Sequence, residues 1–321
     1  MIGKPQVKMS AMRIVVAATA LGYLGISLWS GWDAVIRAVT EVGELGILVG
    51  LVLTLGNIGF RFIRWQCYLR ALGCEVPWAE SLRIFLAGFA VAITPGGAGE
   101  PVVRGLLLKP FRADFQRTFA AYVAERVSDV ICVLALTMLG LFAYPAVRPA
   151  VAGITVVIAT SVLLLRRDVW LNRLRERLRG KGGTFGRLAS HGVEIILQLR
   201  PFFAAPMLAK GLMWGLVAWG LTGAGFYYIV HLAGSDVTLQ IAVFVYSFSI
   251  LVGALSFLPG GLGSSEATMI GLLLVNGMPQ AQAIAVTILS RIVTLWFSVG
   301  IGVWCLSLPP RQVDRREDQS V

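Results

Sequence analysis

The chain has 321 residues, of which 57% are hydrophobic and only 14% are charged, whereas an ordinary soluble domain has about 25% charged residues. Long unbroken apolar runs extend along almost all of it, which excludes a soluble protein and favours membrane-spanning helices. The net charge of +11 does not indicate nucleic-acid binding, because the basic residues lie between apolar runs, where membrane-orientation signals belong.

Six apolar runs can each supply the roughly 20 residues that a helix needs to cross a bilayer. They cover residues 14–30, 45–63, 119–143, 147–165, 211–231 and 283–306. We therefore predict an all-α polytopic membrane protein with one transmembrane domain, 1–310, in two halves of about 45–165 and 207–307. A basic cytoplasmic loop, about 166–206, would join the halves, and the polar residues 311–321 would form a disordered cytoplasmic tail.

Two further apolar stretches, 82–108 and 239–276, are interrupted by proline and glycine. The first break contains Pro95, Gly96, Gly97 and Gly99, and the second contains Pro259, Gly260, Gly261 and Gly263. Such breaks free backbone polar groups, which is tolerated at membrane depth only where the chain lines a cavity or is buried in protein. Both stretches are therefore predicted to be re-entrant helical hairpins.

The basic residues fix the predicted topology. With a cytoplasmic N-terminus and two re-entrant hairpins, all but four of the 28 Lys and Arg residues lie on the cytoplasmic side, as the positive-inside rule requires. The exceptions are Arg37 and Arg148 outside, and Arg126 and Arg291 within spans. Both termini would be cytoplasmic, in a cell inner or plasma membrane. The hairpins would enter from opposite sides and face each other near the midplane.

The two halves share a pattern around their breaks. Each has a PGGxG break, then a glutamate (Glu100 or Glu266), then an intramembrane arginine, Arg126 or Arg291. The separation of the two prolines matches that of the two arginines to within one residue. An odd number of crossings between the halves makes this an inverted repeat, which is a transporter architecture with its binding site where the repeats meet.

Charged residues at membrane depth supply the candidate site. Helix N-termini after the breaks, with Pro101 in the first position of one helix and Ser264 or Ser265 capping the other, can bind an anion. One hypothesis is an anion site for a lipid phosphate. Its alternative is structural: Glu100 and Glu266 pair with the spanning arginines and fasten the hairpins. Further candidates are the ionisable residues Arg61, Arg64, Arg104, Glu125 and Asp129; for Arg61 and Arg64 an interfacial anchoring role is the alternative.

These motifs resemble a known family. The sequences ITPGGAGEPVVR from Ile93 and PGGLGSSEATMIGLLL from Pro259, the pairs Glu125-Arg126 and Ser290-Arg291, and the RxxRW from Arg61 are similar to the flippase-like transmembrane family that includes the membrane domain of lysylphosphatidylglycerol synthases. The resemblance covers about residues 10–307. It implies translocation of a lipid between leaflets, here by a standalone member without the synthase domain.

The leading hypothesis is a flippase or transporter for an anionic or phosphate-bearing lipid, glycolipid or aminoacyl-phospholipid. Its alternatives are a membrane-embedded transferase that uses the carboxylates as acids or bases, and a non-transporting partner of a biosynthetic enzyme. We expect membrane lipids as partners, with a lipid-modifying enzyme or glycosyltransferase as a further one. We expect no nucleic acid, cofactor or metal, and no enzymatic activity; the four cysteines form no metal motif.

The predicted topology can be tested by cysteine labelling. In a chain whose native cysteines are replaced, single cysteines at residues 109–117 should react with a membrane-impermeant reagent from the cytoplasmic side, and those at 277–281 from the opposite side. Labelling of both segments from one side would contradict the inverted repeat.

Overall fold

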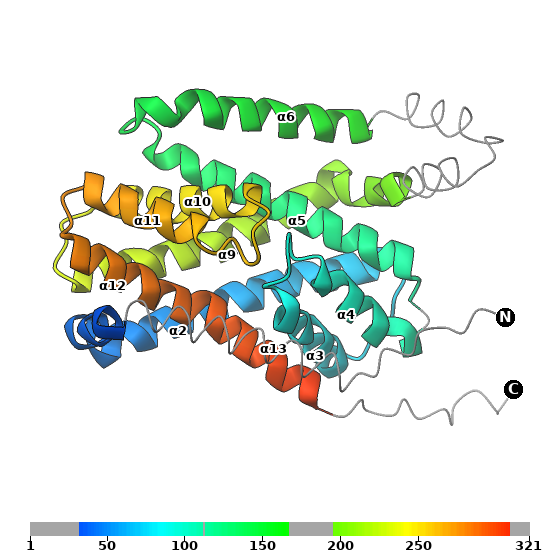
Figure 1. Cartoon of the computed structure of the whole chain (residues 1–321). Coiled ribbons are helices and arrows are strands. Elements are labelled where there is room, and N and C mark those ends of the chain that lie inside the picture. The colour runs from blue at the N-terminus through cyan, green and yellow to red at the C-terminus, as the bar shows by residue number, and fades with distance from the viewer. Residues whose placement is uncertain (1–31, 112, 167–194, 309–321) are drawn as a thin grey trace, which may run out of the picture.

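A computed structural model describes residues 32–111, 113–166 and 195–308 (Figure 1). The expected span 14–30, most of the loop 166–206 and the tail 311–321 lie outside these residues. Within them, every regular element is a helix.

Four helices in the described ranges are long and apolar enough to cross a membrane: Val42–Ala71, Pro145–Leu164, Ala205–Leu232 and Gln280–Ser307. They correspond to four of the six expected spans. The first belongs to α2 (Trp32–Ala71), whose backbone leaves the helical conformation at Gly43, and the third is α9 (Ala205–Leu232). A run of 30 residues gives a helix of about 45 Å, more than the ~30 Å hydrocarbon layer.

Most of the expected span 119–143 lies in α5 (Phe115–Thr137). This helix is not among the four apolar ones, because Glu125, Arg126 and Asp129 interrupt its apolar run. It contacts α9 and α10 (Leu239–Leu255), so it lies inside the bundle (Figure 1). The next helix, α6 (Arg148–Arg166), lies at the edge, and only 6% of its apolar window is buried.

Both broken stretches fold into helical hairpins. In the first, α3 (Trp78–Gly88) and a short turn of helix, Phe89–Val91, are followed by the break and by α4 (Gly99–Leu108), which packs against α3. In the second, α10 leads through the break to α11 (Ser264–Val275), which packs against α10. The predicted breaks are thus confirmed as chain reversals between paired helices.

The helix starts differ from expectation in detail. Pro101 lies at the third position of α4 rather than the first, where a missing N–H is still harmless because the first four N–H groups of a helix have no partner within it. The expectation that Ser264 or Ser265 caps α11 is wrong. The cap is Gly263, at φ 83°, and its N–H donates to the Glu266 carboxylate over 2.7 Å.

The last apolar run consists of α12 (Gln280–Arg291), one wide π-helical turn (Ile292–Trp296) and α13 (Phe297–Ser307). The α12 part packs against α2, and α13 packs against α3 and the turn that follows it. This helix therefore connects the second half of the chain with the first hairpin (Figure 1).

The contact between α13 and the first hairpin depends on a glycine. A Cβ added to Gly302 would meet the backbone N of Ala90 and lie 2.7 Å from the carbonyl carbon of Phe89, and backbone atoms cannot rotate away. Gly300 on the same helix has no atom within 4 Å of such a Cβ. Gly302 is therefore needed for close approach.

We predict that Gly302→Ala lowers the stability of the detergent-solubilised protein by about 1–3 kcal/mol, as overpacked cores do. Gly300→Ala, the matched control, should melt at or slightly above the wild-type temperature, because alanine favours helix over glycine. Thermal unfolding in micelles measures both. Equal melting of the two variants would show that the hairpin does not pack closely against α13.

Candidate functional site

The two breaks meet in the structure. An isolated antiparallel bridge pairs Pro95 with Pro259, so the expectation that the breaks face each other is confirmed. The turns have the same shape: Gly96 and Gly260 both have φ 61°, and Gly97 and Gly261 both have φ 68°. Residues that have a Cβ rarely adopt these backbone angles, which explains why both turns contain paired glycines.

Each turn is held by one polar side chain from a helix of its own half. The Tyr122 hydroxyl on α5 donates to the Gly97 carbonyl over 2.9 Å. Arg291 at the end of α12 donates from Nη2 to the Gly260 carbonyl over 2.8 Å and from Nε to Glu266 over 2.7 Å. The expected pair of Glu266 with Arg291 is therefore present. The other expected pair, Glu100 with Arg126, is a longer ion pair, with 3.9 Å between Oε2 and Nη2.

Beside the first turn lies a buried charge network. Glu125 on α5 is fully buried and accepts from Arg104 of α4 over 2.9 Å and from Arg64 of α2 over 3.5 Å. Both arginines expose none of their surface. The positive-inside rule assigns Arg64 and Arg104 to the cytoplasmic side, but their side chains lie in the protein interior, so an anchoring role at a lipid interface does not fit Arg64.

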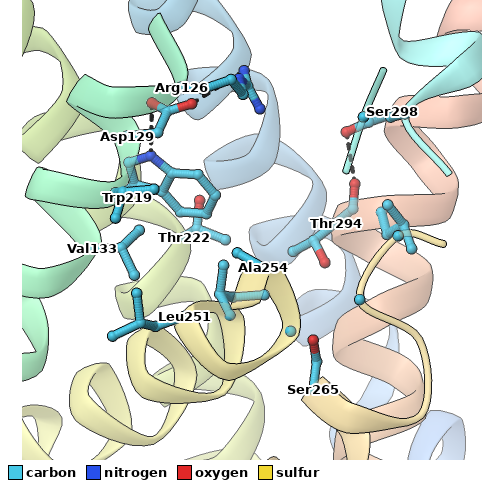
Figure 2. Close-up of a pocket in the computed structure, with 18 of the residues that line it drawn as sticks. Arg126, Asp129, Val133, Trp219, Thr222, Leu251, Ala254, Ser265, Thr294 and Ser298 are labelled. Carbon is cyan, nitrogen blue, oxygen red and sulfur yellow. Dashed lines mark hydrogen bonds and ion pairs between the residues drawn. The ribbon is translucent and has the colours of Figure 1, made fainter. Parts of the chain in front are cut away.

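Asp129, one helical turn beyond Glu125, is surrounded by donors. It accepts from Arg64 over 2.6 Å and from the Trp219 indole of α9 over 3.0 Å, and it lies 3.1 Å from Arg126 and 3.7 Å from Arg61. Figure 2 shows Trp219 and Arg126 on either side of this carboxylate. Asp129 thus joins α2, α5 and α9.

The network carries more positive than negative charge. Four arginines, Arg61, Arg64, Arg104 and Arg126, lie against three carboxylates, Glu100, Glu125 and Asp129. The Arg61 guanidinium is held mainly by the faces of Phe89 and Trp219, at 5.2 and 5.9 Å from its carbon. Nε and Nη2 of both Arg61 and Arg126 are buried without a hydrogen-bond partner among the described residues. Donors of this kind are what an anionic ligand satisfies.

These side chains face a cavity of about 400 Å³ at the junction of the two turns. That volume lies within the range of small-molecule sites, about 300–1,000 Å³. Ten of the residues predicted for the site line it: Arg61, Gly96, Gly97, Glu100, Arg126, Asp129, Gly260, Gly261, Ser265 and Arg291. The other nine lie behind the wall or in the turns: Arg64, Pro95, Gly99, Arg104, Glu125, Pro259, Gly263, Ser264 and Glu266.

The remaining wall is largely apolar, but it also contains uncharged polar side chains that the sequence pattern did not predict. Thr54 and Asn57 come from α2, Thr222 from α9, and Tyr246 from α10. Thr294 lies in the π-helical turn and Ser298 just after it, across the cavity from Trp219 (Figure 2). In apolar helices such residues carry no motif. The π turn, a feature frequent at functional sites, has no sequence signature here.

No group of three or more His, Cys, Asp or Glu side chains in the described part of the chain has a geometry that would hold a metal ion. The acidic side chains that line the cavity lie against guanidinium groups.

Comparison with known proteins places this chain among membrane proteins of one kind. Residues 11–302 match the family model of the lysylphosphatidylglycerol synthase TM region. A UPF0104 membrane protein of Pyrococcus horikoshii is 22% identical, over 85% of this chain and 90% of its own length. One from Methanothermobacter thermautotrophicus is 24% identical, over 91% and 93%. A third, from Methanocaldococcus jannaschii, is 22% identical, over 97% and 99%.

The pair between Arg291 and Glu266 generates a stability prediction. Arg291→Gln leaves the Glu266 carboxylate without its partner and should lower stability by about 3 kcal/mol. Glu266→Gln in the same chain should restore part of the loss, because the unpaired charge is gone. Thermal unfolding of the single and double variants measures the coupling, with Glu75→Gln, an exposed position, as the control. Wild-type melting of Arg291→Gln would show that this pair does not fasten the hairpin.

Proposed function

This chain belongs to the family of the lysylphosphatidylglycerol synthase transmembrane region, and from that premise we propose that it moves an anionic, phosphate-bearing lipid between membrane leaflets. The headgroup binds in the cavity between the two hairpins. The observation that carries the proposal is the set of buried N–H donors on Arg61 and Arg126, two residues that line this cavity; their Nε and Nη2 atoms have no hydrogen-bond partner among the described residues, and Nη2 of each lies within ion-pair distance of Asp129. The free energy lost by leaving charged donors unmet is recovered when a phosphate enters.

The arrangement of the hairpins supports transport. Two broken helices meet at their turns, and the cavity lies at the contact, as in transporters built from inverted repeats. Alternating access would come from rocking one half against the other about Pro95 and Pro259. The protein works in a cell inner or plasma membrane, with six spans, two re-entrant hairpins and both termini in the cytoplasm. A lipid-modifying enzyme or glycosyltransferase supplies the cargo.

The geometry favours transport over a membrane-embedded transferase. A general acid or base needs a carboxyl group that can give or take a proton at the operating pH. Glu125 lies between Arg64 and Arg104, and Asp129 faces three arginines. These contacts make both carboxylates counter-charges of the surrounding arginines, which fits a fixed structural role better than a proton-transfer role.

The proposal predicts that arginines at the cavity are needed for transport more than for folding. Arg61→Gln leaves three arginines against three carboxylates, so the charge network becomes balanced, and stability should fall less than in Arg291→Gln, which removes the ion-pair partner of Glu266. Movement of an anionic lipid in reconstituted vesicles should fall by about tenfold or more, because a charge-assisted contact to the phosphate is lost. A leaflet-resolved quenching assay measures the rate.

The matched control is Arg83→Gln. Arg83 pairs with Glu80 and bonds the Leu308 carbonyl, and it does not line the cavity. Its loss should leave the transport rate unchanged. Wild-type transport by a folded variant that carries both Arg61→Gln and Arg126→Gln would contradict the anion site.

A further inference from the structure

The carboxylates that line the cavity form ion pairs with arginines. Only Glu100 and Asp129 line it among the acidic residues that the structure describes. Asp129 meets Arg64, Arg126 and Arg61 at 2.6, 3.1 and 3.7 Å, and Glu100 lies 3.6 Å from Arg104 and 3.9 Å from Arg126. Glu100 Oε2 and Asp129 Oδ2 have no hydrogen-bond partner among the described residues, but each lies within ion-pair distance of two arginines, with which a ligand ammonium group would have to compete. An entering ammonium would instead meet the excess positive charge of the network.

The arginine N–H donors without a hydrogen-bond partner among the described residues favour a compact anion as the ligand. Arg61 exposes 9% of its surface, and its Nε and Nη2 have no partner among the described residues. Aromatic faces hold this guanidinium in place without satisfying its N–H groups. A planar guanidinium fits the oxygens of a phosphate, and Arg126, on the same side of the cavity, supplies a second one.

The wall across the cavity combines apolar side chains with hydroxyl groups, and its one arginine among the described residues, Arg291, is paired with Glu266. Figure 2 shows Ser265 and Thr294 pointing into the space opposite Arg126 and Asp129. The Ser265 hydroxyl is buried with no hydrogen-bond partner in the described ranges, and Tyr246, Thr54 and Thr222 add hydroxyl groups. Hydroxyl groups both donate and accept, so this wall complements another set of hydroxyl groups.

We propose that the cargo headgroup is a phosphate diester whose second substituent is uncharged and hydroxylated, a glycerol or a sugar, and that headgroups bearing an ammonium are excluded. This rests on the transport function proposed above and narrows its substrate class. The phosphate binds Arg61 and Arg126, and the hydroxyl groups bind the wall that contains Ser265. The aminoacyl lipid in the name of the family does not fit this cavity, because its ammonium groups would lie among arginines.

Two lipids that differ by a lysyl ester, which carries two ammonium groups, give the test. Phosphatidylglycerol and lysyl-phosphatidylglycerol, both labelled on an acyl chain, are placed in phosphatidylcholine vesicles that contain the full-length protein. Phosphatidylglycerol should cross about tenfold faster or more, because like charges repel strongly in a buried site. A polyprenyl hexosyl phosphate distinguishes the two forms of the proposal: faster movement than phosphatidylglycerol assigns a sugar, and slower movement assigns glycerol.

A binding measurement that does not depend on transport distinguishes the proposed headgroup class from the proposed transport function. Phosphatidylglycerol added to the protein in detergent should raise its melting temperature, and the lysyl form should not. Selective stabilisation with no transport of any lipid would overturn the transport function and leave the assigned headgroup. Equal transport or equal stabilisation by the two lipids would overturn the headgroup class and leave transport intact.

Two substitutions test whether Arg61 and Ser265 determine the selectivity between the two lipids. Arg61→Gln should narrow the difference between the two lipids, because the excess positive charge of the network is removed. Ser265→Ala should slow phosphatidylglycerol while its discrimination from the lysyl form persists, because that side chain contacts hydroxyl groups and not charge. Unchanged selectivity in folded Arg61→Gln would contradict the assignment.

Discussion

The fully buried carboxylate of Glu125 is the contact on which the rest of the structure depends. It joins Arg64 of α2 and Arg104 of α4 to α5, and the neighbouring Asp129 adds a second link between α2 and α5. A buried ion pair adds little net stability over a hydrophobic one, but removing one partner is strongly destabilising. The network therefore selects one arrangement of these helices, and that arrangement places the first turn beside the cavity.

The two halves fasten their turns in unequal ways. In the first, the turn adjoins a network of four arginines and three carboxylates, and a neutral tyrosine bonds its backbone. In the second, a single pair, Arg291 with Glu266, serves the same purpose, and one more bond from Arg291 reaches the turn itself. The excess positive charge at the cavity thus comes from the first half, and the second half contributes apolar side chains, hydroxyl groups and the paired Arg291.

The sequence predicted the features that depend on local chemistry. Proline and glycine mark the breaks, and charges in an apolar run single out Arg126, Arg291 and Glu266. What could not be predicted is the direction in which a helical side chain points. Arg61 and Arg64 lie near one end of a long helix, where the positive-inside rule assigns a side of the membrane but cannot distinguish interior from interface. Trp219 and Tyr246 reach the cavity through tertiary packing between helices that are distant in sequence.

The separation of Arg64 from its partners in the sequence has a consequence for biosynthesis. Glu125 follows it by 61 residues, so α2 enters the membrane before any carboxylate that neutralises it has been made. An unpaired arginine at the centre of a helix costs about 2.5–3.5 kcal/mol to insert, whereas one near an end can reach the headgroups. Until α5 is made, the arginines near the end of α2 would therefore be accommodated by reaching the headgroup region, and their burial would follow when α5 supplies the matching carboxylates.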